Sequence, residues 1–267
     1  MLKVGFIGGG NMALAMMGGM LKSDAFTPES IIVSDANCAV LKSLEEKLAV
    51  KAVEDNREVA QWAQIVFLTI KPQFYQSVID QTKDIVLADQ TKMIVTVAPG
   101  WTLSRIQNAV GGPCKIVRTM PNTPAFVGEG MTGACPNELV TATEMQQLCA
   151  LLGSFGQVEV LPENIFDTFS ALCGSSPAFV FMMIEAMADA AVLEGFPRAQ
   201  AYTLVSQAVL GSAKMVLELG KHPGQLKDMV CSPGGSTIEG VSALEEKGMR
   251  AAFFAAIERT AAKARKL

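Results

Sequence analysis

Two short segments combine glycines with residues that can open a helix, which is the composition of an anion-binding turn. The first, near the N-terminus, reads Phe6-Ile-Gly8-Gly9-Gly10-Asn11-Met12-Ala13. It fits G-x-G-x-x-G/A, in which a turn after a strand brings a pyrophosphate onto the free N–H groups of the next helix. The second, Ser232-Pro233-Gly234-Gly235-Ser236-Thr237, interrupts a stretch of helical pattern. Both segments therefore predict sites for negatively charged groups.

The glycines of the first segment have distinct expected roles. Gly8 would allow the tight turn, Gly10 would let the backbone approach the phosphates, and small Ala13 would let the helix pack on the strand. We expect the dinucleotide to contact Gly8, Gly9, Gly10, Asn11 and Met12. The alternative is a glycine turn between a strand and a helix that holds no ligand.

Asp35 stands where a cofactor-selecting acid is expected. It lies 25 residues after Gly10, at the end of the second apolar run. A carboxylate there can accept hydrogen bonds from the adenosine ribose and would repel a 2′-phosphate. No arginine adjoins it, so the sequence favours NADH over NADPH. The alternative is that Asp35 merely caps the following helix.

Proline and glycine follow the next two apolar runs. Lys71-Pro72 ends the third run, and Ala98-Pro99-Gly100 ends the fourth. Ligands of open α/β sheets bind at the carboxyl ends of the strands, so we expect these residues to contact the cofactor. Ordinary turn chemistry is the alternative, because proline and glycine often end strands.

The second glycine segment also has two interpretations. Gly234 and Gly235 permit unusual backbone angles and close approach, and the N–H groups of a helix opened by Ser236 or Thr237 attract anions. Glu239 follows Ser236 by three residues. That is the spacing of a capping box, so a plain helix start stays open as the alternative.

The elements that position these segments follow from hydrophobic periodicity. Short apolar runs bounded by glycine or proline alternate with helical patterns, which indicates βαβ units and a parallel sheet. The runs are largely apolar rather than alternating, as expected of strands buried on both faces. They cover residues 4–7, 31–33, 65–70, 93–97 and 115–118, and two further runs, 131–135 and 158–161, are candidates to extend the sheet.

After Pro162 the pattern becomes entirely helical. We expect a long helix over 163–194 and further helices over 198–219, 223–230, 236–247 and 249–266. The predicted fold is therefore α/β: a Rossmann-like dinucleotide-binding domain of residues 1–162, followed by an all-helical domain of residues 163–267.

Composition narrows the class of protein. The chain has 267 residues and a formal net charge of −4, without the basic stripe of a nucleic-acid surface. A long uncharged stretch, residues 168–184, contains Gly174 and Pro177 and is a poor membrane span, and no signal peptide is evident. Six cysteines without C-x-x-C spacing and a single histidine predict no metal site and a cytoplasmic protein with reduced thiols. His222, which precedes a proline, is expected to be structural.

Several segments together resemble the pyrroline-5-carboxylate reductases over essentially the whole chain. They are "FIGGGNM", "KPQ", "RTMPNTPAFVGEGMTG", "CGSSPAFVFMMIEAMADAAV", "GFPRAQA", "HPGQLKDMVCSPGGSTIEGV" and "LEEKGMRAA". The resemblance implies hydride transfer from NADPH or NADH to the C=N bond of 1-pyrroline-5-carboxylate, which gives L-proline. It also implies that the all-helical domain of residues 163–267 dimerises and helps to bind substrate. The protein is then at least a homodimer, with larger rings known in the family, and its active site lies at the interface between subunits.

The resemblance assigns roles to individual residues. The segment Ser232, Pro233, Gly234, Gly235 and Ser236 is similar to the family's cradle for the substrate carboxylate. Thr237 matches a threonine close to the ring nitrogen and is the candidate catalytic residue. Asn56, Ile70, Lys71 and Ala98 match cofactor contacts. Glu163 matches a position near the substrate, although a first-turn glutamate favoured by the helix dipole is the alternative.

Two departures from the family pattern qualify the resemblance. Cys173 stands where the family commonly has serine, which could make the site oxidisable, and Asp35 stands where many members carry small polar or basic residues. Two other classes stay open: another imine or β-hydroxyacid-type Rossmann reductase, and a non-catalytic nicotinamide-binding protein. A β-hydroxyacid dehydrogenase needs a lysine on the long helix, and residues 163–194 contain none.

Overall fold

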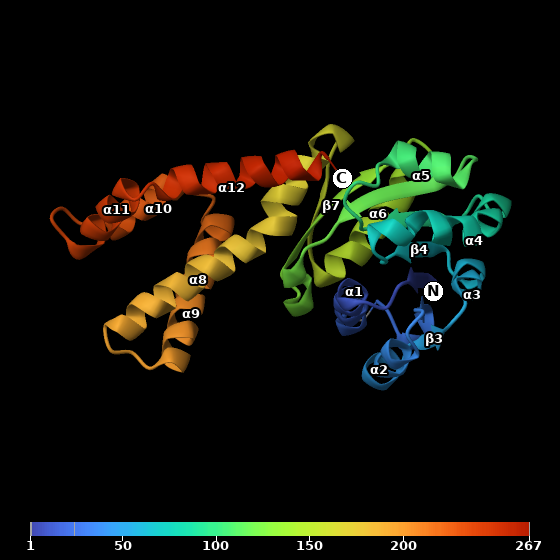
Figure 1. Ribbon diagram of the computed structural model, residues 1–267, viewed down its shortest axis with the longest axis horizontal. Coiled ribbons are helices and arrows are strands. Elements are labelled where there is room, and N and C mark those ends of the chain that lie inside the picture. The colour runs from blue at the N-terminus through green and yellow to red at the C-terminus, as the bar shows by residue number, and fades with distance from the viewer. Residues whose placement is uncertain (1, 24, 267) are drawn as a thin grey trace. The chain divides into compact units, whose positions relative to one another are not determined.

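The computed structural model describes residues 2–23 and 25–266 (Figure 1). The chain forms two compact units, one reaching Ser175 and taking in the chain from Ala261 onward, the other running from Ser176 to Thr260. The boundary expected after residue 162 marks the change from strands to helices. The first unit extends beyond that point because the start of the helical segment packs against its last strands.

An eight-stranded sheet organises the first unit. Its spatial order is β3-β2-β1-β4-β5-β6-β7-β8. The strands are β1 Val4–Ile7, β2 Ile31–Ser34, β3 Lys51–Val53, β4 Ile65–Leu68, β5 Met93–Thr96, β6 Lys115–Met120, β7 Gly130–Pro136 and β8 Gly156–Val160. Strands β1 to β6 are parallel, β7 is antiparallel to β6, and β8 is parallel to β7. The sheet is thus Rossmann-like, extended by the two runs named as candidates.

Helices cover both faces of the sheet, which explains why the strands between them are apolar on both sides. The helices are α1 Asn11–Lys22, α2 Cys38–Leu48, α3 Asn56–Trp62, α4 Tyr75–Ala88, α5 Leu103–Val110 and α6 Ala142–Leu152. Side chains of α1 and α6 share one core with Phe6 and Phe67, whose rings stack with centroids 5.0 Å apart. Side chains of α3, α4 and α5 share the other core with Ile7 and Leu68. Strands β1, β2, β4 and β5 are accordingly buried at every residue.

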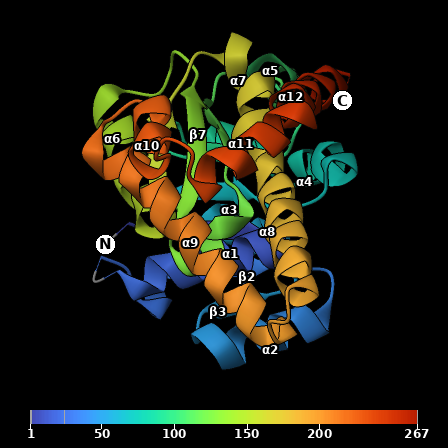
Figure 2. The ribbon, with the colours of Figure 1, turned by 90° about the vertical axis from the view of Figure 1, so that its left-hand side faces the viewer.

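The second unit consists of helices, including most of α12. They are α8 Ser176–Leu193, α9 Arg198–Leu219, α10 Pro223–Val230, α11 Ser236–Glu246 and α12 Met249–Ala264. Helices α8 and α9 lie side by side (Figures 1 and 2), packed through Ala188, Ala201 and Val205. Many large apolar side chains of this unit are exposed in the single chain, among them Phe181, Met182 and Leu217. Exposed apolar surface of this extent indicates that another protein chain covers it.

The segment expected to be one helix from residue 163 is helical but irregular. It begins with a 3₁₀ turn at Glu163–Ile165, continues as α7 Phe166–Phe169, and passes through a π-helical stretch, Ser170–Ser175, into α8. Pro177 has no N–H to donate to the carbonyl of Cys173, four residues earlier. The Asn122 amide donates to that carbonyl instead, at 2.9 Å. A π-helical stretch at this position is a frequent mark of functional sites.

The helical segment from Glu163 also contains the apolar stretch that was expected to be a poor membrane span. Glu163–Leu193 is long and apolar enough, by length and composition alone, to cross a membrane, and only 11% of its most apolar window is buried in the single chain. Gly174 and Pro177 therefore do not prevent the segment from meeting that criterion. Apolar exposure of this kind is equally expected of a helix that a partner subunit covers.

Candidate cofactor and substrate sites

A cavity opens at the carboxyl ends of the parallel strands, at the point where the strand order changes direction on the two sides of β1. Strand β1 lies between β2 and β4 at this switch point. The cavity has a volume of about 420 Å³ and is lined by residues that follow four different strands, together with the start of α4. They are Ile7, Gly8, Gly10, Asp35, Ala36, Asn56, Thr69, Ile70, Lys71, Phe74, Ser77 and Val78. Ligands of doubly wound sheets bind at this edge.

The glycine turn after β1 leaves backbone amides open to this cavity. Gly8 has φ of +102°, and its N–H donates to the carbonyl of Ser34 at 2.7 Å. Gly10 is the N-cap of α1, makes no side-chain capping bond, and has no heavy atom within 4 Å of the position that a Cβ would occupy. The turn therefore offers a helix N-terminus and the space for a phosphate group to approach it.

Asp35 is held at this turn by two backbone amides. Its Oδ2 accepts from the N–H of Gly9 at 2.8 Å, and its Oδ1 accepts from the N–H of Asn37 at 2.9 Å. The cap of α2 is Asn37, whose Oδ1 accepts from the N–H of Ala39 at 3.0 Å. The alternative that Asp35 caps the next helix is wrong, because Asn37 performs that role. A fixed carboxylate thus lies at the β2 side of the cavity.

Asn56 is fixed in a chain of polar side chains. Its Oδ1 accepts from the Ser34 hydroxyl at 2.8 Å, and its Nδ2 donates to the Gln81 Oε1 at 2.8 Å. The cap of α3 is the neighbouring Asp55. Asn56 is therefore free of a capping role and is oriented toward the cavity by residues of β2 and α4.

The residues expected near the cofactor after β4 and β5 fall in two places. Ile70 and Lys71 line the 420 Å³ cavity, whereas Pro72 and Pro99 line a separate cavity of about 160 Å³ with Trp101 and Arg105. Gly9, Asn11, Met12, Ala98 and Gly100 line neither cavity. Their roles as cofactor contacts stay predictions.

Sequence reasoning missed six residues of the 420 Å³ cavity: Ile7, Ala36, Thr69, Phe74, Ser77 and Val78. Thr69 directly follows β4, and its hydroxyl donates to the carbonyl of Gly8 at 2.6 Å. Because Thr69 immediately precedes Ile70, an expected cofactor contact, its position in the sequence could have indicated that it lines the cavity. Phe74 immediately precedes α4, and Ser77 and Val78 lie in the first turn of α4. No local pattern distinguishes these residues from their neighbours.

Glu163 belongs to a buried ion-pair network in the first unit. Its Oε1 accepts from the N–H of Leu103, the first residue of α5, at 2.8 Å, and from Arg118 Nη1 at 3.2 Å. Arg118 is only 2% exposed, and its Nη2 also donates to Asp167 Oδ1 at 3.0 Å. The guanidinium lies 4.6 Å above the ring of Phe166. Glu163 therefore has a structural role, and its contact with substrate stays a prediction.

The second glycine segment forms a tight turn between α10 and α11. The N–H of Gly235 donates to the carbonyl of Ser232 at 3.0 Å, and Gly234, after Pro233, has φ of +67°. Proline followed by a glycine of positive φ is the sequence of a type II turn. The backbone therefore favours glycine at Gly234, whereas a Cβ on Gly235 would lie 2.4 Å from the Ser232 hydroxyl and would displace that side chain.

Helix α11 begins at Ser236, with Gly235 as its N-cap and no side-chain capping bond. Ser236 therefore forms no capping box with Glu239, because it lies inside the helix, and a plain helix start that holds no ligand stays the alternative. The first-turn amides are left for another acceptor, and Thr237 is exposed beside them in the single chain. His222 Nδ1 accepts from the N–H of Gly224 at 3.1 Å and caps α10, which is the structural role expected of it.

Cys173 lies half-buried in the π-helical stretch. Burial raises the pKa of its thiol, so a smaller fraction is present as the reactive thiolate. Its backbone carbonyl holds the Asn122 amide, whose Oδ1 accepts from the N–H of Met131 at 2.8 Å. The environment of Cys173 thus lowers the reactivity that the substitution for serine suggested.

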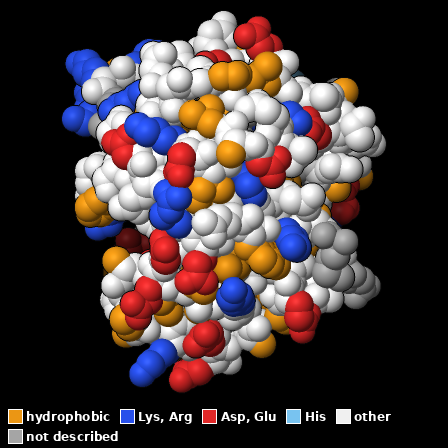
Figure 3. Space-filling view, turned by 90° about the vertical axis from the view of Figure 1, so that its right-hand side faces the viewer, with side chains coloured by type: hydrophobic (Ala, Val, Ile, Leu, Met, Phe, Trp, Pro, Cys, Tyr) orange, Lys and Arg blue, Asp and Glu red, His pale blue; other side chains and the backbone are white. Residues whose placement is uncertain are grey.

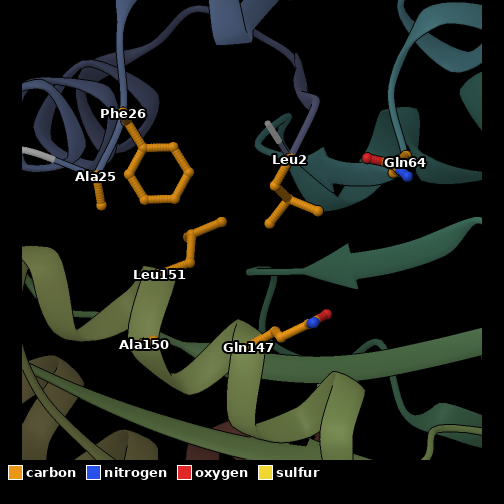
Figure 4. A pocket seen from close by; sticks show the side chains of 7 residues that line it. All are labelled: Leu2, Ala25, Phe26, Gln64, Gln147, Ala150 and Leu151. Atoms are coloured by element: carbon orange, nitrogen blue, oxygen red, sulfur yellow. The ribbon is translucent and has the colours of Figure 1, made fainter.

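A cavity of about 480 Å³ lies at the opposite edge of the sheet (Figure 4). Leu2, Phe26 and Leu151 point into it, with the amides of Gln64 and Gln147 at its border. Leu2 and Gln64 precede β1 and β4, so this cavity lies at the amino ends of the strands, away from the loops that carry ligands.

Figure 3 shows that acidic and basic side chains are interspersed on the surface in view.

Comparison with known proteins gives consistent matches. A family model described as pyrroline-5-carboxylate reductase dimerisation matches residues 163–267, and one described as NADP oxidoreductase coenzyme F420-dependent matches residues 3–100. A pyrroline-5-carboxylate reductase of Escherichia coli is 47% identical over 265 residues, covering 99% of this chain and 98% of the relative.

Solved structures agree over the whole chain. A pyrroline-5-carboxylate reductase structure from Coxiella burnetii has a TM-score of 0.92 at 33% identity, covering 99% of this chain and 98% of that chain. A Plasmodium falciparum pyrroline carboxylate reductase with NADP bound has a TM-score of 0.90 at 29% identity, covering 99% and 97%.

Proposed function

The chain belongs to the pyrroline-5-carboxylate reductase family, and we propose that the 420 Å³ cavity binds its dinucleotide while the Ser232–Thr237 turn binds the substrate carboxylate. The protein is an oxidoreductase that uses NAD(P)H to reduce the C=N bond of 1-pyrroline-5-carboxylate to L-proline, the last step of proline biosynthesis. It acts as a homodimer. Family membership decides against the β-hydroxyacid dehydrogenase and the non-catalytic alternatives.

The residues at the carboxyl edge of the sheet fit a dinucleotide. The open amides at Gly10 face the space that a pyrophosphate needs, and Asp35 and Asn56 are fixed where the adenosine ribose would lie. Ile70 and Lys71 lie across the switch point, toward the nicotinamide half. When bound, the reduced nicotinamide supplies the hydride.

The observation that carries the substrate proposal is the uncapped start of α11 after a type II turn. Its amides can hold a carboxylate, as helix N-termini commonly do. The Thr237 hydroxyl would then hydrogen-bond the ring nitrogen and fix the orientation of the ring. A substrate imine that arrives protonated needs no strong general acid, so positioning accounts for most of the chemistry.

We expect Thr237→Ala to lower kcat by about tenfold to a hundredfold, equivalent to the loss of one hydrogen bond to a charged group. The KM for the cofactor should change little, because Thr237 is placed at the substrate. Steady-state kinetics with both substrates varied would measure this split. Thr237→Ser, which keeps the hydroxyl, serves as the matched control. If Thr237→Ala shows wild-type kinetics, Thr237 is not part of the active site.

We also propose that the enzyme prefers NADH, because the Asp35 carboxylate lies at the cavity and would repel a 2′-phosphate. Asp35→Asn keeps an acceptor for the Gly9 amide but removes the charge. It should raise kcat/KM for NADPH by about tenfold, while NADH changes less. Titrating both cofactors in parallel in the reduction of pyrroline-5-carboxylate would test this preference and the activity itself. An unchanged cofactor ratio would contradict the role of Asp35.

We also propose that the enzyme is soluble and cytoplasmic, and that protein covers the exposed surfaces of α8 and α9. The dimerisation match over 163–267 supports coverage by a second copy. Assembly of dimers into larger rings is compatible with this surface. Light scattering during size-exclusion chromatography would give the assembly, and cell fractionation would give the location. Recovery in the membrane fraction would contradict the proposal.

A further inference from the structure

Tyr75 is completely buried beneath the carboxyl ends of β4 and β5, and its hydroxyl joins the two strands. The hydroxyl donates to the carbonyl of Leu68, the last residue of β4, at 2.6 Å. It accepts from the Thr96 hydroxyl, at the end of β5, at 2.9 Å, and from the N–H of Val97 at 3.3 Å. One oxygen atom therefore fixes the ends of two neighbouring strands relative to each other.

The ring of Tyr75 extends this connection to the loops that follow the strands. It stacks on the ring of Trp101, with centroids 4.9 Å apart. Trp101 comes after the Ala98–Gly100 turn, and its Nε1 donates to the carbonyl of Pro72 at 3.1 Å. The N–H of Ala98 in turn donates to the Thr96 hydroxyl at 3.3 Å. The two loops are thus held by a single buried cluster of Tyr75, Thr96 and Trp101.

The loop after β4 lines the 420 Å³ cavity on the side expected to hold the nicotinamide, and the loop after β5 is the next one along the same edge of the sheet. Asp35 holds the β2 side, where the adenosine ribose is expected, and the dinucleotide extends across the switch point. The other end therefore meets the loops after β4 and β5, which carry Lys71 and Ala98. Hydride transfer depends steeply on placement, because a displacement of about 1 Å can lower a rate about a hundredfold.

We propose that Tyr75 is a positioning residue for hydride transfer, holding the loops after β4 and β5 in the spacing that seats the nicotinamide against the substrate. The inference rests on the function proposed above and adds a residue that touches neither cofactor nor substrate. Burial raises the pKa of Tyr75 to about 12, so its hydroxyl keeps the proton that it donates to Leu68. No local sequence pattern around Tyr75 indicates this role.

Tyr75→Phe tests the proposal, because it keeps the ring and its stack on Trp101 but removes the oxygen. We expect kcat to fall about tenfold, with the KM for NADH within about threefold of wild type. The primary isotope effect with NADH deuterated at the transferred position should rise, because hydride transfer becomes the slower step. A loss of stability alone would reduce the amount of active enzyme without changing the isotope effect.

Two further changes make the test specific. Thr96→Val removes the hydroxyl that bonds Tyr75 and should lower kcat in the same direction, whereas Thr96→Ser should restore it; this pair carries the test if Tyr75→Phe does not fold. Thr82→Val is the matched control, since the buried Thr82 hydroxyl donates only to Val78 of its own helix, at 2.9 Å. It should leave kcat and the isotope effect unchanged.

Unchanged kcat and isotope effect in both Tyr75→Phe and Thr96→Val would overturn the inference, as would an equal fall of kcat in Thr82→Val. Wild-type turnover of pyrroline-5-carboxylate, measured first, separates the two ideas. Its absence would overturn the proposed function together with this inference. Wild-type turnover with unaffected variants would overturn the positioning role alone.

Discussion

Gly8→Ala should abolish binding of the nicotinamide cofactor and destabilise the first unit. Gly8 has φ of +102°, and a Cβ there would lie 2.7 Å from Ile70 Cγ2 and 2.8 Å from the backbone carbonyl oxygen of Thr69. Backbone strain and overpacking each cost about 1–3 kcal/mol, and the turn can relieve them only by moving away from β4. Fluorescence titration with NADH and thermal unfolding would measure both effects.

Two other glycines, Gly10 in the same segment and Gly18 in α1, serve as comparisons for Gly8→Ala. A Cβ on Gly10 meets no atom within 4 Å, so Gly10→Ala should fold normally and yet weaken cofactor binding, because the methyl group occupies the approach to the amides. Gly18, further along α1, also has open space around it. Gly18→Ala should bind cofactor normally and stabilise the helix by about 0.5–1 kcal/mol. Normal binding by Gly8→Ala would contradict the location of the cofactor site.

The double variant Phe181→Glu, Met182→Glu should be monomeric and inactive. These α8 side chains are 61% and 68% exposed in the single chain, within the segment that matches the dimerisation family. Burying an unpaired charge in an apolar interface costs about 3 kcal/mol or more, which raises the dissociation constant at least about a hundredfold. Light scattering and turnover, both measured over a dilution series, would show whether activity follows the dimer.

Leu139→Glu is the control for this charge change, because Leu139 is 40% exposed in the first unit. It should remain dimeric and active. If the α8 variant stays dimeric with full activity, this face of α8 lies outside the interface. If it is monomeric yet active, the active site does not need the second subunit.

Local patterns were sufficient to predict the central parallel strands and most helices of this chain. The parallel strands are short and buried on both faces, so they appear as continuous apolar runs with proline or glycine at their ends. The helices over 198–219 and 223–230 have the predicted bounds. Strand β3 escaped notice because it lies at the exposed edge of the sheet, where Lys51 breaks the apolar pattern. The antiparallel direction of β7 depends on pairing with β6, which no local pattern encodes.

Within the candidate sites, the sequence by itself located the glycine turn after β1, Asp35 and the Ser232–Thr237 turn. The two turns depend on backbone chemistry confined to a few consecutive residues, such as the positive φ of Gly8 and Gly234. Asp35 was located by its place at the end of the second apolar run. Only the tertiary structure decided the partners of the side chains. Asp35 bonds Gly9, Glu163 pairs with Arg118, and Tyr75 joins β4 to β5. The physical reason is that these contacts join residues far apart in the chain, brought together by the order of the strands.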